Sequence, residues 1–179
     1  MRLKKERREC FICIPQCPLF FEYNTNEFSA VLGDLINALC DEHLNIDRTR
    51  VYLLGVSYGG HAVTYECLRH PERYAAAIPT VAWTYVAGLD FQANTYLYGI
   101  DEYHRPFDEN GYFKLAQTPL WLAYSHLEVQ YNEPLSIELK AIDAPVKTTR
   151  IDRRGHAMFT LFFRDEPWTD WLFAQQKEI

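Results

Sequence analysis

The sequence predicts an α/β protein with a mostly parallel sheet flanked by helices. Short apolar segments alternate with amphipathic ones along the chain, which is typical of repeated strand–helix units. The segment VYLLGV (residues 51–56) is apolar throughout, as expected for a parallel strand that is covered on both faces. The chain has 179 residues, 48% of them hydrophobic, which fits one domain with a substantial core.

The first expected elements are a strand and a helix. The strand is FICIP (residues 11–15), a β-rich run that Pro15 stops. The helix lies within residues 24–43, and Asn24 or Thr25 can cap its start. Its apolar stripe recurs at helical spacing and consists of Phe28, Val31, Leu32, Leu35, Ile36, Leu39 and Cys40.

The rest of the chain continues the alternation. The strand at residues 51–56 leads into a helix over residues 61–70, which Pro71 ends. Further strands are expected at residues 74–81, 119–125 and 146–151, and further helices at residues 134–142 and 165–177. Four large side chains of the last helix are expected to face the core: Trp168, Trp171, Leu172 and Phe173.

An aromatic-rich insertion at residues 83–113 interrupts this alternation. Two interpretations fit it. A long insertion in a compact domain is often a lid or a pocket wall, and it can also be an aromatic cluster that covers the sheet. On the first interpretation, Trp83 and Tyr85 are the expected substrate-binding residues.

Charge and hydropathy limit the expected partners and location. The net charge of −6 argues against nucleic acid or an anionic membrane as a partner. The basic start MRLKKERRE is interleaved with Glu6 and Glu9 and is expected to be a solvated arm or a helix surface. No apolar run approaches the ~18 residues of a membrane span, and no secretory h-region is recognised. A cytoplasmic location is therefore expected.

The five cysteines point to reduced thiols rather than disulfides, because their number is odd. The spacing of Cys10, Cys13 and Cys17 resembles a metal clip. However, a strand would place Cys10 and Cys13 on opposite faces, and no second ligand pair follows. We expect buried or half-buried thiols, no metal and no organic cofactor.

The segment GVSYGG lies between the apolar strand and a helix, which is the setting of a G-x-S-x-G nucleophile elbow. Gly55 and Gly59 are expected to leave room where the strand and the helix approach each other. Ser57 is the predicted nucleophile, and the backbone N–H of Tyr58 at the helix N-terminus is a predicted oxyanion donor. The alternative is a glycine-rich turn that merely requires a small residue.

A serine hydroxyl needs a general base, and six histidines compete for this role. In this type of fold the order along the chain is serine, acid, histidine, with the histidine after the last strand. His156 fits, because RGHAMF directly follows the expected strand at residues 146–151. His61 and His70 lie on the helix after the elbow and are expected to be packing or surface residues.

The acid is expected on the loop that leaves the strand at residues 119–125. Glu128 lies there, in the segment WLAYSHLE, and a glutamate can orient an imidazole as an aspartate does. Asp152 is the alternative. It is close to His156 in sequence, but it lies on the same loop as His156, after the strand at residues 146–151. Asp143, at the end of a helix, is a weaker alternative.

At these residues the chain resembles the α/β-hydrolase superfamily. The branch it resembles most contains polyhydroxybutyrate depolymerase-like, feruloyl-esterase-like and dienelactone-hydrolase-like proteins. The matching segments are IPQCPLF, IDRTRVYLLGVSYGGHAVTYECLRHPERYAAAIP, PLWLAYSHLE, RGHAMF and WTDWLF. The resemblance implies Ser57 as nucleophile, Glu128 in place of the usual aspartate, and His156 as base.

The resemblance also implies a single α/β-hydrolase domain, residues 1–179, that is incomplete at its N-terminus. IPQCP would be the fourth strand of such a fold. Three features of such a fold have no counterpart in the sequence. They are the strands expected before IPQCP, the third strand, and the H-G-G type loop that supplies a second oxyanion N–H.

The expected activity is that of a serine esterase acting through an acyl-enzyme on a small-molecule or polysaccharide-linked ester, such as a hydroxycinnamoyl or short acyl ester. One alternative is a prolyl-oligopeptidase-like serine peptidase, because G-x-S-Y-G-G also resembles that group. Another is an inactive, truncated hydrolase domain, and a third is a lyase or transferase on the same fold. Homo-oligomer formation stays open.

Overall fold

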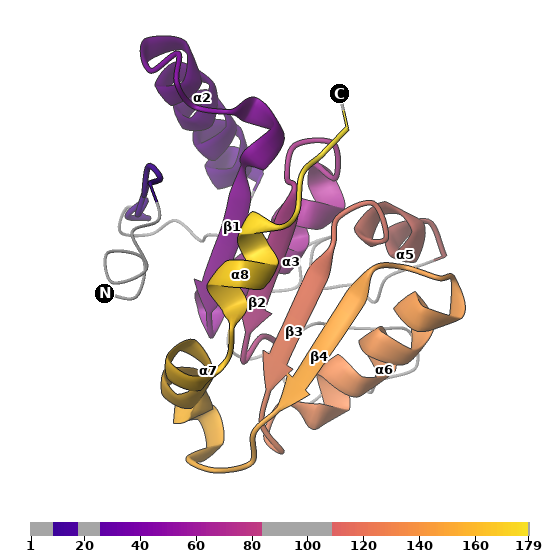
Figure 1. Ribbon diagram of the computed structural model, residues 1–179. Coiled ribbons are helices and arrows are strands. Elements are labelled where there is room, and N and C mark those ends of the chain that lie inside the picture. Colours follow the sequence, from indigo (N-terminus) through magenta and orange to yellow (C-terminus); the bar gives the residue numbers. More distant parts are fainter. Residues whose placement is uncertain (1–8, 18–25, 84–108, 179) are drawn as a thin grey trace.

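Four parallel strands form the centre of the structure (Figure 1). The computed structural model describes residues 9–17, 26–83 and 109–178. The strands lie side by side in the order β1 (Tyr52–Val56), β2 (Ala76–Thr80), β3 (Leu120–Tyr124) and β4 (Val146–Arg150). Each falls within a predicted strand, and all three pairings are parallel. The α/β class with a parallel sheet is therefore confirmed.

The side chains of β3 show how the sheet is covered on both faces, because successive residues of a strand point to opposite faces. On one face, Leu120 and Leu122 join a core with helices α3 (Tyr58–Arg69), α5 (Glu109–Leu115) and α6 (Val129–Ala141). Trp121 and Ala123 join a second core on the other face. That core includes Met158 and residues of α7 (Phe159–Asp165) and α8 (Trp168–Phe173), namely Phe162, Trp168 and Leu172.

Helix α2 (Asn26–Glu42) precedes the sheet in the chain and packs on the same side as α3. Its residue Ile36 packs against the first core. Gly33 brings α2 close to Arg73, since a Cβ atom at position 33 would lie 2.9 Å from the guanidinium nitrogens. Phe28, Leu32 and Cys40 of the predicted stripe are buried, whereas Val31 is 64% exposed, so the stripe is confirmed in part. The residues expected to cap its start, Asn24 and Thr25, lie outside the described residues.

The predicted strand at residues 11–15 is wrong, because residues 9–17 contain no strand. Phe11 and Ile12 are each 52% exposed and Ile14 is 86% exposed. Strand propensity is realised only where a neighbouring strand supplies the ladder, and this run has none in the described residues. Cys10 and Cys13 are consequently exposed rather than buried as expected.

Two other predicted helices differ from the observed ones. Helix α6 begins at Val129, not at residue 134, and Pro134 lies inside it. The predicted helix at residues 165–177 is shorter in the structure, where α8 covers Trp168–Phe173 and Pro167 occupies the cap position before it. Helix α7 lies almost wholly before the predicted range and was not predicted. Proline suits the start of a helix because its φ is already fixed near the helical value and it has no N–H to leave unpaired, which fits Pro167 before α8. Trp168 and Leu172 are buried as expected.

Most of the predicted insertion at residues 83–113, including Tyr85, lies outside the described residues. Its final part forms the start of α5, where Tyr112 contributes to the first core. None of the helices in the described ranges is both long and apolar enough to cross a bilayer.

Candidate active site

Ser57 lies in the sharp turn between β1 and α3, at the carboxyl end of the sheet, toward which the strand arrows point in Figure 1. Its backbone has a φ of 58° and a ψ of −120°, a conformation that non-glycine residues rarely adopt. Such backbone strain costs on the order of 1–3 kcal/mol and persists only where the surroundings enforce it. One enforcing contact is the hydrogen bond from the Ser57 N–H to the carbonyl of Thr80 on β2, at 2.9 Å.

The glycines around Ser57 make this turn sterically possible. A Cβ atom on Gly55 would lie 2.1 Å from the carbonyl oxygen of Gly59, and one on Gly60 would lie 2.7 Å from that of Thr80. A Cβ atom on Gly59 would meet no atom of the described structure within 4 Å. The expectation that Gly55 and Gly59 provide space is therefore correct for Gly55 and wrong for Gly59. The second position where a side chain would clash is Gly60.

His156 lies next to Ser57 although 99 positions separate them in the chain. It belongs to the short 3-10 helix η4 (Gly155–Met158), which follows β4. Arg154 and Gly155 just before it have φ values of 68° and 50° and turn the chain back toward the sheet edge. The Nε2 atom of His156 lies 2.9 Å from the Oγ atom of Ser57, a hydrogen-bond distance.

Glu128 lies on the other side of the imidazole, on the loop between β3 and α6. Its Oε1 atom is 2.7 Å from the Nδ1 atom of His156. Its Oε2 atom accepts hydrogen bonds from Ser125, at 3.0 Å from the backbone N–H and 2.7 Å from the hydroxyl. The side chain of Glu128 is only 1% exposed. Both carboxylate oxygens are therefore hydrogen-bonded inside the protein.

These contacts determine the protonation of Glu128. Burial acts to raise the pKa of the carboxyl, but the hydrogen bonds from His156 and Ser125 outweigh burial and hold the pKa below its ordinary value. Glu128 is thus ionised at neutral pH. A carboxylate at Nδ1 keeps the ring proton on that nitrogen, which leaves Nε2 free to accept the serine proton.

The competing acids are engaged elsewhere. Asp152 is exposed and binds Arg150, whose Nε lies 2.9 Å from its Oδ1. This hydrogen bond lowers the pKa of Asp152. Asp143 follows α6 and precedes β4, so it lies at the opposite end of the sheet from Ser57. Of the three predicted acids, the structure therefore brings only Glu128 to His156.

The remaining predicted site residues have different positions. Tyr58 is the first residue of α3, which places its backbone at the helix N-terminus beside Ser57. The Trp83 ring stacks on His156, with ring centroids 5.8 Å apart and 14° between the planes. Tyr85 lies outside the described residues. His61 is a packing residue as expected, 3% exposed on α3.

Sequence reasoning missed Ser125 and Asn132. Ser125 holds Glu128 through two hydrogen bonds, and its S-x-x-E spacing to Glu128 is the signature of a capping box, which could have identified it. Asn132 is fully buried, and its Nδ2 atom donates to the carbonyls of Ala82, at 2.9 Å, and Glu128, at 3.0 Å. No local sequence pattern indicates the contact between Asn132 and Ala82, because the two residues are 50 positions apart.

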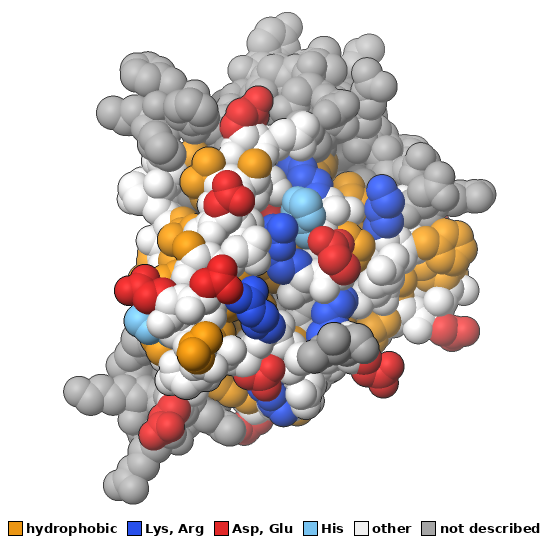
Figure 2. Space-filling model, turned by 90° about the horizontal axis from the view of Figure 1, so that it is seen from above, with side chains coloured by type: hydrophobic (Ala, Val, Ile, Leu, Met, Phe, Trp, Pro, Cys, Tyr) orange, Lys and Arg blue, Asp and Glu red, His pale blue; other side chains and the backbone are white. Residues whose placement is uncertain are grey.

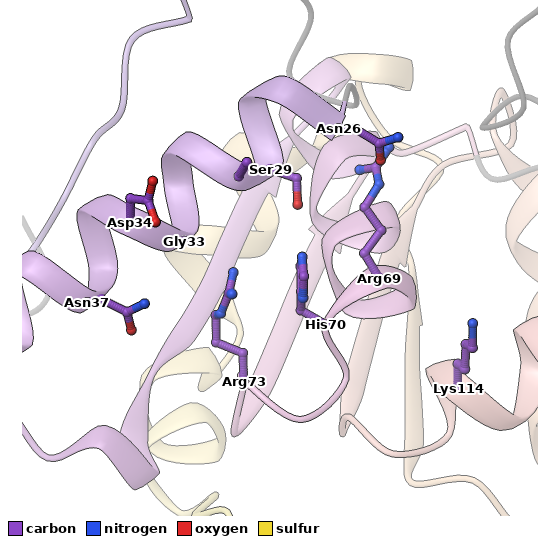
Figure 3. Close-up of a pocket in the computed structure, with 10 residues that line it drawn as sticks. Asn26, Ser29, Gly33, Asp34, Asn37, Arg69, His70, Arg73 and Lys114 are labelled. Carbon is purple, nitrogen blue, oxygen red and sulfur yellow. The ribbon is translucent and has the colours of Figure 1, made fainter.

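A pocket of about 510 Å³ lies away from these residues, at the other end of α3 between α2 and α5. Figure 3 shows His70 and Arg73 extending from the end of α3 and the following turn toward α2. The twelve residues of α3 separate this pocket from Ser57 by roughly 18 Å, at about 1.5 Å per residue.

The chemistry of this pocket differs from that at Ser57. Figure 2 shows its face, where Lys and Arg side chains gather with a histidine and acidic side chains lie among them. Arg69 lies 3.8 Å from Glu66, and His70 lies 3.3 Å from Glu72. None of the predicted catalytic residues lines the pocket. We therefore place the candidate active site at the Ser57 end of the sheet.

The model of the prolyl oligopeptidase family matches residues 21–137, well over half of the chain. This chain belongs to the prolyl oligopeptidase family. The match covers the Ser57 elbow and Glu128. No curated protein matches the sequence.

Solved structures give the same fold at low sequence identity. A thermostable esterase matches with a TM-score of 0.67 and 22% identity over 87% of this chain and 38% of its own. The acylaminoacyl peptidase of Pyrococcus horikoshii matches with a TM-score of 0.64 and 16% identity over 88% of this chain and 29% of its own. The fluorophosphonate-binding serine hydrolase F of Staphylococcus aureus matches with a TM-score of 0.56 and 15% identity, over 81% and 63%.

This chain thus spans less than two thirds of the length of each of these proteins. At such identities the likeness concerns the fold alone. It confirms the predicted α/β-hydrolase fold, of which the chain covers a part.

Proposed function

We propose that this chain carries the catalytic site of a serine hydrolase that cleaves carboxylic esters. Ser57 is the nucleophile, His156 the general base and Glu128 the acid that orients the base. The observation that carries this proposal is the continuous hydrogen-bond chain from Ser57 Oγ through His156 to Glu128, with distances of 2.9 and 2.7 Å. A nucleophile, a base and an orienting group in this order are the geometric signature of an activated serine.

Acylation follows from this geometry. The Ser57 hydroxyl gives its proton to Nε2 of His156 as Oγ forms a bond to the ester carbonyl carbon. The carbonyl π electrons move to its oxygen, which becomes an oxyanion. The oxyanion then collapses, the bond to the alcohol oxygen breaks, and His156 returns the proton to the leaving alcohol. The product is an acyl-enzyme on Ser57 and a free alcohol.

Deacylation repeats these steps with water. His156 takes one proton from water as the water oxygen bonds to the acyl carbon, and it returns this proton to Ser57 Oγ when the acyl bond breaks. In both halves the imidazolium is transiently positive. The buried carboxylate of Glu128 stabilises this charge at Nδ1.

For the oxyanion we propose the backbone N–H of Tyr58 as one donor. Tyr58 directly follows the nucleophile and begins α3, so the positive end of the helix dipole lies at this position. Oxyanion donors are typically worth ~10²–10³ in rate each. The α3 N-terminus is therefore a substantial part of the proposed machinery.

The acyl group that we propose is apolar or aromatic, such as a short acyl or a hydroxycinnamoyl group. The support is the many aromatic residues of the insertion that follow Trp83 in the sequence, a composition that fits the wall of a pocket. This substrate class matches the feruloyl-esterase-like branch that the sequence resembles. Fold alone does not determine the substrate, so this step depends on a direct assay.

The second candidate function is cleavage of peptide or aminoacyl-amide bonds, which membership of the prolyl oligopeptidase family favours. The same three residues can perform it. The chemical difference is the leaving group, because an amine must receive the proton from His156 before the C–N bond can break. The two functions therefore differ in substrate and not in the roles of the residues.

Hydrolysis assays with two matched panels test the proposal. One panel consists of p-nitrophenyl esters from acetate to hexanoate and methyl ferulate, and the other of aminoacyl- and acylaminoacyl-p-nitroanilides. We expect turnover of esters that Ser57→Ala abolishes. Turnover confined to the anilides would favour the peptidase, and an unchanged rate in Ser57→Ala would exclude Ser57 as the nucleophile.

A further inference from the structure

We propose that Trp83 is a positioning residue that holds the His156 imidazole and stabilises its protonated form through the face of the indole ring. This inference rests on the proposed role of His156 as general base. The two rings are stacked, with 5.8 Å between centroids and 14° between planes. Glu128 contacts the edge of the imidazole at Nδ1, whereas Trp83 contacts its face. The two supports are therefore complementary.

The backbone at Trp83 is fixed on its carbonyl side by His61 of α3. The Nδ1 atom of His61 lies 2.5 Å from the Trp83 carbonyl oxygen. A carbonyl oxygen can only accept, so this nitrogen carries the ring proton of His61. The backbone N–H of His61 in turn donates to the carbonyl of Ser57 at 3.0 Å. Trp83 is thereby tied to the helix that carries the nucleophile.

A second anchor lies one residue earlier. The carbonyl of Ala82 accepts a hydrogen bond from Asn132, which also donates to the carbonyl of Glu128. Asn132 is fully buried, so both hydrogen bonds are shielded from water. Trp83 therefore follows a residue that is tied to the acid. These two anchors fix the backbone at Trp83 relative to both neighbours of His156.

The stacking matters when the imidazole becomes charged. A cation within about 6 Å of the centroid of a tryptophan ring is attracted by the negative face of that ring. The 5.8 Å separation satisfies this distance. During the reaction the imidazole gains its positive charge when it takes the proton of Ser57, so the attraction is stronger in the transition state than before proton transfer. Only such differential interactions accelerate the chemical step.

Three charged side chains on the loops that carry His156 and Glu128 have partners in the structure. Glu128 binds its Nδ1 atom. Asp152 pairs with Arg150, and Arg154 hydrogen-bonds to Thr160 at 3.4 Å. The indole face of Trp83 is consequently well placed to add to the stabilisation that Glu128 provides.

The kinetic test compares Trp83→Tyr, Trp83→Phe and Trp83→Leu on p-nitrophenyl acetate, butyrate and hexanoate. We expect Trp83→Leu to lower kcat by about 3- to 30-fold, the range expected for a lost cation–π contact. The aromatic variants should retain more activity than the leucine variant. The loss should be the same for all three acyl groups, with KM little changed. A loss that depends on acyl length, or lies mainly in KM, would overturn the proposal and make Trp83 a wall of the acyl pocket.

A second measurement does not need turnover. A protonated imidazole in contact with an indole quenches its fluorescence, so acidification should quench Trp83 emission in the folded wild type. The quenching should disappear in both Trp83→Phe and His156→Ala and persist in Trp171→Phe, whose indole lies in α8. Quenching that persists in His156→Ala would overturn the stacking itself. If the protein shows the quenching but no Ser57-dependent turnover, the contact between Trp83 and His156 is upheld and the proposed hydrolase function is refuted.

Discussion

Charged and polar side chains cluster near both ends of helix α3, and the two clusters differ in burial and hydrogen bonding. At its N-terminal end, Ser57, His156 and Glu128 form a hydrogen-bonded chain whose carboxylate is 1% exposed. At its C-terminal end, a pocket of about 510 Å³ has a mixed lining that includes Asp34 and the cations Arg69, Arg73 and Lys114. One ion pair there is largely buried, Arg69 with Glu66, and the other is exposed, with the Glu72 side chain beside His70 66% exposed. Exposed ion pairs contribute little, whereas a buried and fully hydrogen-bonded network is rigid.

The comparison shows that a hollow region is not by itself one prepared for chemistry. Catalysis requires groups held at fixed distances before the substrate arrives. Among the described residues, a serine, a histidine and a carboxylate are held together in this way at the Ser57 end. Substitutions at the two ends should therefore have very different effects.

The largest effect is expected at the base. We predict that His156→Ala lowers kcat/KM for the preferred ester by about 10⁵- to 10⁶-fold, because the proton of Ser57 then has no acceptor. Steady-state kinetics with the purified protein measure this loss. Circular dichroism of the variant is the control for folding. A loss below tenfold in a folded variant would rule out His156 as the base.

A loss of about 10⁴-fold is expected for Glu128→Gln, which keeps the shape of the side chain but removes its charge. The amide cannot hold the imidazole tautomer and accept from Ser125 as the carboxylate does. Asp152→Asn is the matched control, since Asp152 binds Arg150 instead. If the Asp152 variant were the more impaired of the two, the assignment of the acid would be wrong.

The elbow itself can be broken sterically. We predict that Gly55→Ala destabilises the protein by about 3 kcal/mol or more, because the new methyl group would lie 2.1 Å from a backbone oxygen. Gly59→Ala is the control within the same motif. It should change the free energy of unfolding by less than about 1 kcal/mol, because its methyl group meets no atom of the described structure within 4 Å. Urea denaturation measures both, and equal effects would contradict the observed turn.

The ionisation of Glu128 gives a prediction on pH and stability. The pKa of Glu128 in the folded state lies below its unfolded value, because hydrogen bonds from His156 and Ser125 outweigh burial. Its charged form therefore stabilises the fold above the unfolded pKa, and this contribution is lost as the pH falls through the folded pKa. Urea unfolding at pH 7 and pH 3 should show a larger loss of stability for wild type than for Glu128→Gln. Equal losses would show that Glu128 gains nothing from its native partners.

The smallest effect is expected at the far end of α3. Lys114→Ala removes an exposed cation from the pocket and should change the free energy of unfolding by less than about 0.5 kcal/mol. The rate of ester hydrolysis should be unchanged. A clear loss of activity on removing this lysine would mean that the two ends of α3 are coupled.

The elements that could be predicted are those with a local signal. The continuous apolar run at β1, the stripe of α2 and the strand–turn–helix setting of Ser57 are each contained in a short stretch of sequence. The segment FICIP has an equally local signal and still forms no strand. A strand needs a partner, and a partner is a property of the whole fold.

In the candidate site, too, some residues have a local signal in the sequence and others depend on the whole fold. Ser57, His156 and Glu128 follow from a motif and from chain order, and the structure brings them together. The supports contributed by Asn132 and by the stacking of Trp83 on His156 were not predicted. Both join positions that are more than 45 residues apart, and such contacts leave no local pattern.

The most direct test of the account is covalent labelling of the folded protein with a fluorophosphonate, followed by mapping of the adduct by mass spectrometry. A fluorophosphonate reacts only with a serine whose proton can be removed, so it reports the assembled Ser57–His156–Glu128 chain without any assumption about the substrate. The account predicts a single adduct on Ser57 that is absent in Ser57→Ala and strongly reduced in His156→Ala. A folded protein that gains no adduct, or gains one elsewhere, would contradict it.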